Sequence, residues 1–229
     1  MIDTTGDGDV LLAAGAAMES VQIPPYLWFR VGGVDDTASA ANAMLFRTTG
    51  TGRMLVPWGP LGRRIDPCDP DDLTAAELEC RAEARRLFDA LRRDNVAFKD
   101  AWIDDYARIL GITESRRLQG DYVLQKEDGD VHFDDAVART GHWTRRKVVY
   151  DIPYRCLTTP AASNLLTAGR CISTTRYVHQ ATKEIPAAMA TGQAAGVAAA
   201  HAASAGHGDV RSVDVAAVRR ALAAAGAII

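Results

Sequence analysis

The chain has 229 residues, of which 48% are hydrophobic, and its 26 basic and 29 acidic residues give a net charge of −3. This apolar content is enough for the core of one large domain or of two small ones. The charges form no long run of one sign, which argues against the basic footprint of a nucleic-acid-binding protein.

Four cysteines are scattered along the sequence without any C-x-x-C pair: Cys68, Cys80, Cys156 and Cys171. This spacing argues against a zinc ribbon and against a ferredoxin-type iron–sulfur cluster. We therefore expect free thiols in a reducing compartment, and no metal site.

Two stretches bear on where the protein resides. The first residues lack the basic n-region and the apolar core of a signal peptide. The alanine-rich stretch 186–205 has the length of a membrane span, but it contains Gln193 and His201 and lacks an aromatic belt. We expect a cytoplasmic protein that does not cross a membrane. Gly192 and Gly196 indicate close packing of this stretch against a sheet.

The chain opens on a short turn. Ile2 is a single apolar residue, and the polar run 3–9 that follows is broken by two glycines. Residues 10–17 are typical of a small helix.

The middle of the chain mixes strand and helix signals. Residues 21–34 enter an expected strand through two prolines, and residues 50–58 give a second one, so we expect an antiparallel pair. Residues 35–47, between them, have helical character. Residues 73–93 carry apolar positions at helical spacing and predict a long amphipathic helix, and residues 100–110 predict a second helix.

The second half of the chain alternates in the same way. Residues 112–124 end in an expected strand, residues 133–140 predict a short helix, and residues 147–157 predict another strand. The last expected element is an amphipathic helix at residues 213–225.

One corner of the sequence has the character of an anion-binding site. The apolar run 165–168 predicts a buried strand, and Gly169 stops it. Because proline suits the first turn of a helix, we expect the next helix to begin at residues 184–186. A strand, a glycine turn and a helix start together direct free backbone N–H groups and the positive end of a helix dipole at one place.

Three segments together resemble the C-terminal part of bacterial FAD-dependent oxidoreductases, whose last strand reads apolar-apolar-x-Ala-Gly-Arg and whose last helix opens with proline. They are residues 151–200, IDTTGDGDV at residues 2–10, and ITESRRLQGDYVL at residues 112–124. The resemblance spans nearly the whole chain, and its motifs are specific in combination.

The resemblance implies an α/β fold with α+β character in the substrate part. It also implies that the chain forms an incomplete FAD/NAD(P)-binding domain into which a mixed substrate domain is inserted. The expected divisions are the end of the FAD-binding first half at 1–17, the substrate or cap domain at 18–155, the returning strand and helix at 156–206, and a C-terminal helix at 207–229.

The sequence contains no G-x-G-x-x-G motif after a strand, which is the pyrophosphate-binding signature of a dinucleotide fold. Either the chain is a fragment, from a truncated or mis-started gene product, or a separate polypeptide supplies that half. We therefore expect FAD binding only together with the G-x-G-x-x-G half.

The implied cofactor is FAD, bound through the two glycine turns and the helix that begins near Pro186. Arg170 stands where many related flavoproteins carry aspartate, so a bond from an aspartate to the ribityl chain is not expected, and the arginine is expected to meet a phosphate or an acid. The implied cofactor-binding residues are Thr5, Gly6, Asp7, Ala168, Gly169, Arg170, Pro186, Ala187, Ala188 and Met189.

The segment between the last strand and that helix carries the expected catalytic residues, His179 and Arg176. We expect a loop over residues 173–183, and a histidine there titrates near neutrality and suits a proton donor.

Expected substrate-binding residues lie upstream of this segment. Arg116 and Arg117 either clamp an acidic group of the substrate or form a structural ion pair with Glu114 or Asp121. Tyr154 and Arg155 follow a proline that favours extended backbone, and we expect both to point at the active site.

The predicted function is flavin-mediated redox chemistry on an unidentified small molecule, by an FAD-dependent oxidoreductase that is not active as the isolated chain. One alternative is a non-catalytic fragment or partner-binding subunit that needs a separate N-terminal chain. Another is a flavin subunit like that of heterodisulfide reductase with an iron–sulfur partner, a pattern from which the cysteines depart. No nucleic-acid or membrane partner is expected.

Overall fold

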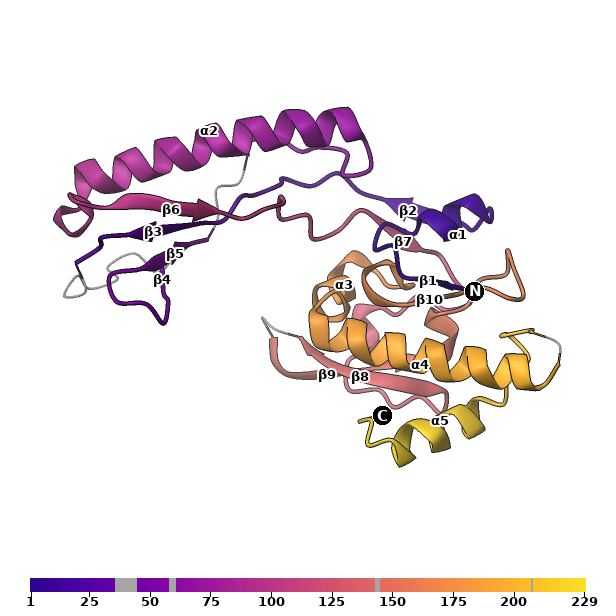
Figure 1. Ribbon diagram of the computed structural model, residues 1–229. Helices are drawn as coiled ribbons and strands as arrows, with labels where there is room; N and C mark the ends of the chain where they lie inside the picture. The colour runs from indigo at the N-terminus through magenta and orange to yellow at the C-terminus, as the bar shows by residue number, and fades with distance from the viewer. Residues whose placement is uncertain (36–44, 58–60, 143–144, 207) are drawn as a thin grey trace. The chain divides into compact units, whose positions relative to one another are not determined.

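The computed structural model describes residues 1–35, 45–57, 61–142, 145–206 and 208–229. The chain divides into two compact units, each with helices and strands as an α/β protein has (Figure 1). Unit 1 comprises Met1–Ser20 and Glu114–Ile229, and unit 2 comprises Val21–Thr113. No described helix combines the length and the apolar character that a membrane crossing requires.

Unit 2 is an antiparallel sheet with one long helix. Its elements are β3 (Phe29–Gly32), β4 (Phe46–Arg47), β5 (Met54–Val56), α2 (Pro70–Asp94), the 3₁₀ helix η1 (Val96–Phe98) and β6 (Trp102–Tyr106). The strand order is β4-β5-β3-β6. The helix α2 lies along one face of the sheet (Figure 1), where Phe88 joins a core with Phe29, Val31 and Met54.

Two expectations for unit 2 are confirmed. Strands β3 and β5 form the predicted antiparallel pair. The long helix begins where Asp69 accepts hydrogen bonds from two backbone N–H groups of the first turn and Pro70 takes the first helical position. The helix α2 therefore forms from its apolar spacing and its N-terminal cap together.

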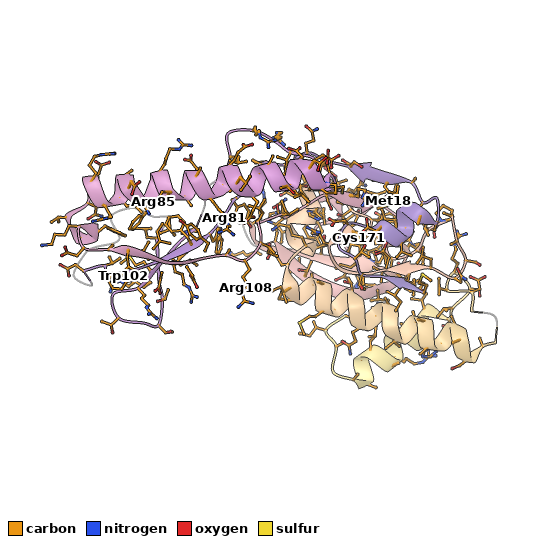
Figure 2. The ribbon with its side chains drawn as sticks, turned by 45° about the horizontal axis from the view of Figure 1, so that its top comes forward. Met18, Arg81, Arg85, Trp102, Arg108 and Cys171 are labelled. Atoms are coloured by element: carbon orange, nitrogen blue, oxygen red, sulfur yellow. The ribbon has the colours of Figure 1, made fainter. Side chains whose placement is uncertain are left out.

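The helix predicted at residues 100–110 is wrong, because this segment forms β6. Its acidic residues pair across the sheet, Asp105 with Arg30 and Asp104 with Arg53. The exposed indole of Trp102 (Figure 2) lies against the backbone of β3. The helical character expected at 35–47 falls mostly outside the described residues, and its end forms β4.

Unit 1 holds the remaining elements. They are β1 (Ile2–Asp3), α1 (Asp9–Ala13), β2 (Met18–Ser20), β7 (Arg116–Leu118), η2 (Lys126–Asp128), β8 (Ala136–His142), β9 (Arg145–Pro153), η3 (Tyr154–Cys156), β10 (Leu166–Thr167), η4 (Gly169–Cys171), α3 (Arg176–Thr182), α4 (Ile185–Ser204) and α5 (Val215–Ala224), where η marks a 3₁₀ helix.

The helix α4 is the centre of unit 1. It packs against β8, β10, α3 and α5 (Figure 1), and its buried alanines, including Ala194 and Ala198, join the core with Leu166, Val178 and Leu222. Strands β1 and β10 pair in parallel, whereas β2 pairs with β7, and β8 with β9, in antiparallel fashion. These contacts place the ends of β1 and β10 beside α4.

Three expectations for unit 1 are corrected. The cap domain does not extend over 114–155, because this segment packs with α4 and pairs with β2. Residues 136–142 form a strand and not a helix, since they pair along β9. The segment 173–183 is not a loop, because it contains α3.

The close packing of α4 comes from its alanines and not from Gly192 or Gly196. A Cβ atom added at either glycine would meet no other atom within 4 Å. Both glycines therefore lie on the side of α4 that carries no close packing contact.

Candidate flavin site

Two parallel strands end side by side in unit 1. Asp3 on β1 is aligned with Thr167 on β10, and the Ala168 N–H donates to the Asp3 carbonyl at 3.0 Å. Each strand is followed by a glycine in the left-handed region, Gly6 with φ 83° and Gly169 with φ 81°. Because glycine alone adopts such values without strain, the two turns depend on these residues.

The Asp3 carboxylate holds the first turn in shape. It accepts hydrogen bonds from the Thr5 N–H at 2.9 Å, from the Thr5 hydroxyl at 2.7 Å, and from the Leu11 N–H at 2.8 Å. The Thr5 hydroxyl, expected to bind the cofactor, is thus engaged within the turn. Asp3 itself was missed by sequence reasoning, although an acid before Thr-Thr-Gly is a signal for such a turn.

The second turn lies against the start of α4. The Gly169 N–H donates to the Thr191 hydroxyl at 3.0 Å, and that hydroxyl bonds in turn to the Ala187 carbonyl at 2.9 Å. A Cβ atom added at Gly169 would lie 3.7 Å from the Ala188 Cβ. Thr191 therefore ties the glycine turn to the first turns of α4, a role that sequence reasoning missed.

Replacing Thr191 with valine should lower the free energy of unfolding by about 1–3 kcal/mol, because the shape is kept while the buried Gly169 N–H loses its acceptor. Urea denaturation of both proteins measures the change. Thr191→Ser keeps the hydroxyl and is the matched control. A loss for Thr191→Val no larger than that for Thr191→Ser would show that the hydrogen bond is not the main contribution of Thr191.

The free backbone donors of α4 differ from those expected. No side chain within the described ranges caps its N-terminus. The Ala188 N–H already donates to the Glu184 carbonyl at 2.9 Å, and Met189 lies one residue further into the helix. The N–H groups that lack an intrahelical acceptor are those of Ile185 and Ala187, since Pro186 has none.

Two exposed side chains near these donors are apolar, next to the charged N-cap residue Glu184. The Ile185 side chain is 75% exposed and the Met189 side chain is 71% exposed, both on the first turns of α4. N–H groups without an intrahelical acceptor, next to exposed apolar side chains, suit a ligand that is flat, apolar and edged with acceptors.

Arg170 connects the two glycine turns. Its Nε donates to the Gly6 carbonyl at 3.1 Å, and its Nη2 contacts the Asp7 carboxylate at 2.6 Å. The Ser115 hydroxyl also donates to Asp7. Arg170 therefore meets an acid, one of the two partners expected for it.

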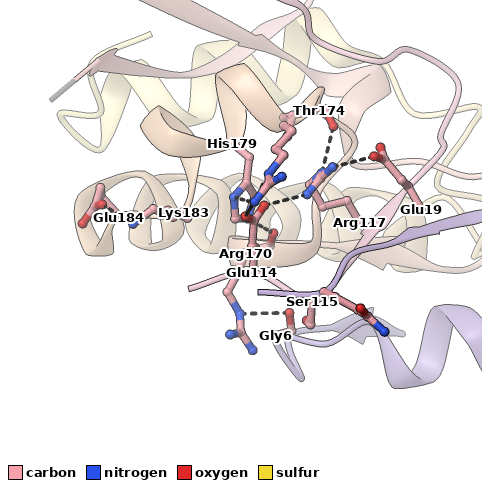
Figure 3. Close-up of polar contacts among 12 residues, drawn as sticks. Gly6, Glu19, Glu114, Ser115, Arg117, Arg170, Thr174, His179, Lys183 and Glu184 are labelled. Atoms are coloured by element: carbon pink, nitrogen blue, oxygen red, sulfur yellow. Dashed lines mark hydrogen bonds and ion pairs between the residues drawn. The ribbon is translucent and has the colours of Figure 1, made fainter. Parts of the chain in front are cut away.

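A cluster of charged residues lies next to the Gly169 turn (Figure 3). The Glu114 side chain is nearly buried and receives Arg176 Nη2 at 2.6 Å and Arg117 Nη1 at 3.1 Å. Arg117 has no exposed surface and also pairs with Glu19 at 2.9 Å. One carboxylate thus joins two arginines from different elements, β7 and α3.

This cluster decides between the two roles considered for the paired arginines. Arg117 is a structural ion-pair partner of Glu114, because no part of it reaches solvent. Asp121 pairs with Arg211 instead. Arg116 is largely buried and pairs with Asp9. The expectation that Arg116 and Arg117 clamp a substrate is not supported by these positions.

His179 is fully buried between the cluster and the turn. Its Nε2 lies 3.1 Å from the Arg170 carbonyl and donates to it, and its Nδ1 lies 4.0 Å from Glu114. Burial, and next the charge of Arg117, lowers the pKa of His179 to about 3. Its burial argues against titration near neutrality and favours a neutral hydrogen-bond donor.

Tyr154 and Arg155 belong to η3, and their side chains bond to residues outside the glycine turns, Tyr154 to Val210 and Arg155 to Asp135. The Tyr154 hydroxyl donates at 2.7 Å to the carbonyl of Val210, which follows the C-terminus of α4. The backbone of this segment lies beside the last strand, since the Ser173 N–H donates to the Cys156 carbonyl at 3.0 Å and the Thr167 N–H donates to the Leu157 carbonyl at 2.9 Å. Tyr154 and Arg155 both line a pocket of ≈ 930 Å³ whose lining includes no residue of either glycine turn, and the expectation that they face the active site gains no support from these positions.

Cys171 is a buried thiol next to Met18 (Figure 2), and burial raises its pKa. Across the described ranges, no three His, Cys, Asp or Glu side chains lie close enough to hold a metal ion.

The residues at the two turns fit the ring end of FAD. Gly6 and Gly169 carry no side chain at the strand ends, where the Arg170 guanidinium lies against Gly6, and the α4 donors lie beside exposed apolar side chains. We refer to the Gly6 turn, the Gly169 turn and the first turn of α4 as the flavin corner.

Comparison with known families bears on the cofactor. Residues 38–222 match the family described as FAD dependent oxidoreductase. No curated protein and no solved structure matches the chain. Because the family match covers more than half of the sequence, the chain belongs to the FAD dependent oxidoreductase family.

Proposed function

We propose that this chain takes part in flavin-mediated oxidation or reduction of a small molecule, with the isoalloxazine ring of FAD held at the flavin corner. One observation carries the proposal: the two glycine turns after β1 and β10 meet the N-terminus of α4, which no described side chain caps. FAD, when bound, supplies the electron transfer, and the protein supplies position and electrostatics.

The residues of the corner have distinct roles in this proposal. The N–H groups of Ile185 and Ala187, with the helix dipole, stabilise negative charge on the bound ring. The apolar side chains of Ile185 and Met189 exclude water from its face. Thr191 fixes the distance between the Gly169 turn and the helix.

Arg176 is the side chain of the cluster that is available to a substrate. Glu114 holds its Nε at 3.0 Å and its Nη2 at 2.6 Å, while half of the side chain stays exposed. A guanidinium fixed on one edge presents its other edge in a defined direction. We assign Arg176 the binding of an acidic group, and His179 the positioning of the Arg170 carbonyl.

A further part of the proposal concerns the pyrophosphate of FAD. We propose that a G-x-G-x-x-G segment on a separate polypeptide binds it and that the chain described here supplies the ring end. In that case FAD binds tightly to the pair and weakly to this chain alone.

The proposal predicts flavin absorption bands when the chain is co-expressed with a separately encoded G-x-G-x-x-G polypeptide and FAD is added. Bands with the chain alone would support the flavin site and contradict the need for a partner. No bands in either preparation would contradict the proposed function and favour a non-catalytic subunit.

A matched pair of variants locates the cofactor. Gly169 and Gly226 both have φ 81°, and an added methyl group meets only Ala188, at 3.7 Å, in the first case and no atom within 4 Å in the second. Gly169→Ala should lose the flavin bands, and Gly226→Ala should keep them. Equal loss in both variants would show that backbone strain alone removes the cofactor.

A further inference from the structure

Arg170 is held at both its backbone and its side chain. The His179 imidazole donates to its carbonyl, while its guanidinium bonds to Gly6 and Asp7 across the corner. The residue therefore belongs to the Gly169 turn by its backbone and contacts the Gly6 turn by its side chain.

The fit between Arg170 and the Gly6 turn is close. A Cβ atom added at Gly6 would lie 2.9 Å from Arg170 Nη2, so the glycine leaves room for the guanidinium as well as allowing the positive φ. Asp7 receives a second donor, the Ser115 hydroxyl. The carboxylate is thus fixed from two sides and sets the direction of the arginine.

We infer that Arg170 is a positioning residue that clamps the two glycine turns together, and that it is not a ligand of the FAD phosphates. The inference rests on the proposed function, because it concerns the shape of the corner that receives the ring. The Arg170 guanidinium is three-quarters buried and is already bonded to Gly6 and Asp7.

The two roles for Arg170 differ in what Asp7 does. If Arg170 clamps the turns, removing the charge of Asp7 loosens the corner in the same way as removing the arginine. If Arg170 binds a phosphate, Asp7 competes for it, and removing that charge frees the arginine for FAD. Asp7→Asn therefore has opposite effects in the two cases.

The test measures the dissociation constant of FAD by quenching of flavin fluorescence, on the chain in complex with its G-x-G-x-x-G partner. For a clamp, Arg170→Met and Asp7→Asn each weaken FAD binding by about tenfold, and the double variant is no weaker than either single one. Tighter or unchanged binding in Asp7→Asn, with weaker binding in Arg170→Met, would overturn the inference.

Arg211→Met is the control, because Arg211 pairs with Asp121 in the pocket that Tyr154 and Arg155 line. We expect it to bind FAD like the wild type. All dissociation constants are compared at a temperature where circular dichroism shows every variant folded, so that a loss of stability alone does not move them.

A second measurement separates failure of the inference from failure of the proposed function. If the wild-type complex binds no FAD, the proposed function fails, but urea denaturation of the two single variants and the double variant still tests the clamp. If the double variant loses less free energy of unfolding than the sum of the two single losses, Asp7 and Arg170 act together and the clamp is supported. Additive losses contradict the clamp.

Discussion

Replacing Glu114 with glutamine should lower the free energy of unfolding by up to about 3–5 kcal/mol, because the buried Arg117 then keeps only the half-exposed Glu19 as a carboxylate partner. Arg117 has no exposed surface, so water cannot take over the lost interaction. Arg176 loses the same carboxylate, but because it is half exposed its lost ion pair is expected to account for a smaller part of the destabilisation. Urea denaturation at neutral pH measures the change.

Two further variants show whether the cost comes from the charge. Glu127 is exposed in the same unit, and Glu127→Gln should leave stability nearly unchanged. Combining Glu114→Gln with Arg117→Met removes both buried charges and should recover most of the loss, since an apolar side chain of similar length replaces the arginine. If the double variant is no more stable than Glu114→Gln, loss of packing and not an unpaired charge explains the effect.

Backbone signals in the sequence predicted the Gly169 turn and the start of α4. Gly169 and Pro186 report directly on local geometry, because a positive φ and a missing N–H restrict where each residue can stand. The helix α2 was predicted for a similar reason, since its cap at Asp69 and its apolar spacing act within one segment. Local determinants of this kind are readable without the fold.

Features that depend on distant partners were not readable. Strand β6 has the polar composition of a surface helix, and Asp104 and Asp105 acquire their arginine partners only across the sheet. The surroundings of His179 were missed, and the role of Arg117 was left open between a substrate contact and an ion pair, because burial is a property of the packed chain. Glu114 was noted as a neighbour of the arginines, but nothing local indicates that it also receives Arg176 from α3.

Lowering the pH should destabilise the protein through His179. The folded-state pKa is lowered from 6.5 to about 3, so between these values the unfolded chain binds a proton that the folded chain does not. The contribution of neutral His179 is therefore complete above about pH 6.5 and is lost as the pH falls. Between about pH 7 and about pH 5 the loss amounts to about 2 kcal/mol.

The measurement compares wild type with His179→Gln by urea denaturation at both pH values. The wild type should lose about 2 kcal/mol more than the variant, since glutamine can still donate to the Arg170 carbonyl but does not titrate. His201→Gln, near the other end of α4, should keep the wild-type dependence. An NMR titration of the imidazole gives the pKa directly. A pKa near neutrality would restore His179 as a proton donor, whereas one well below 5 would confirm that it positions the turn.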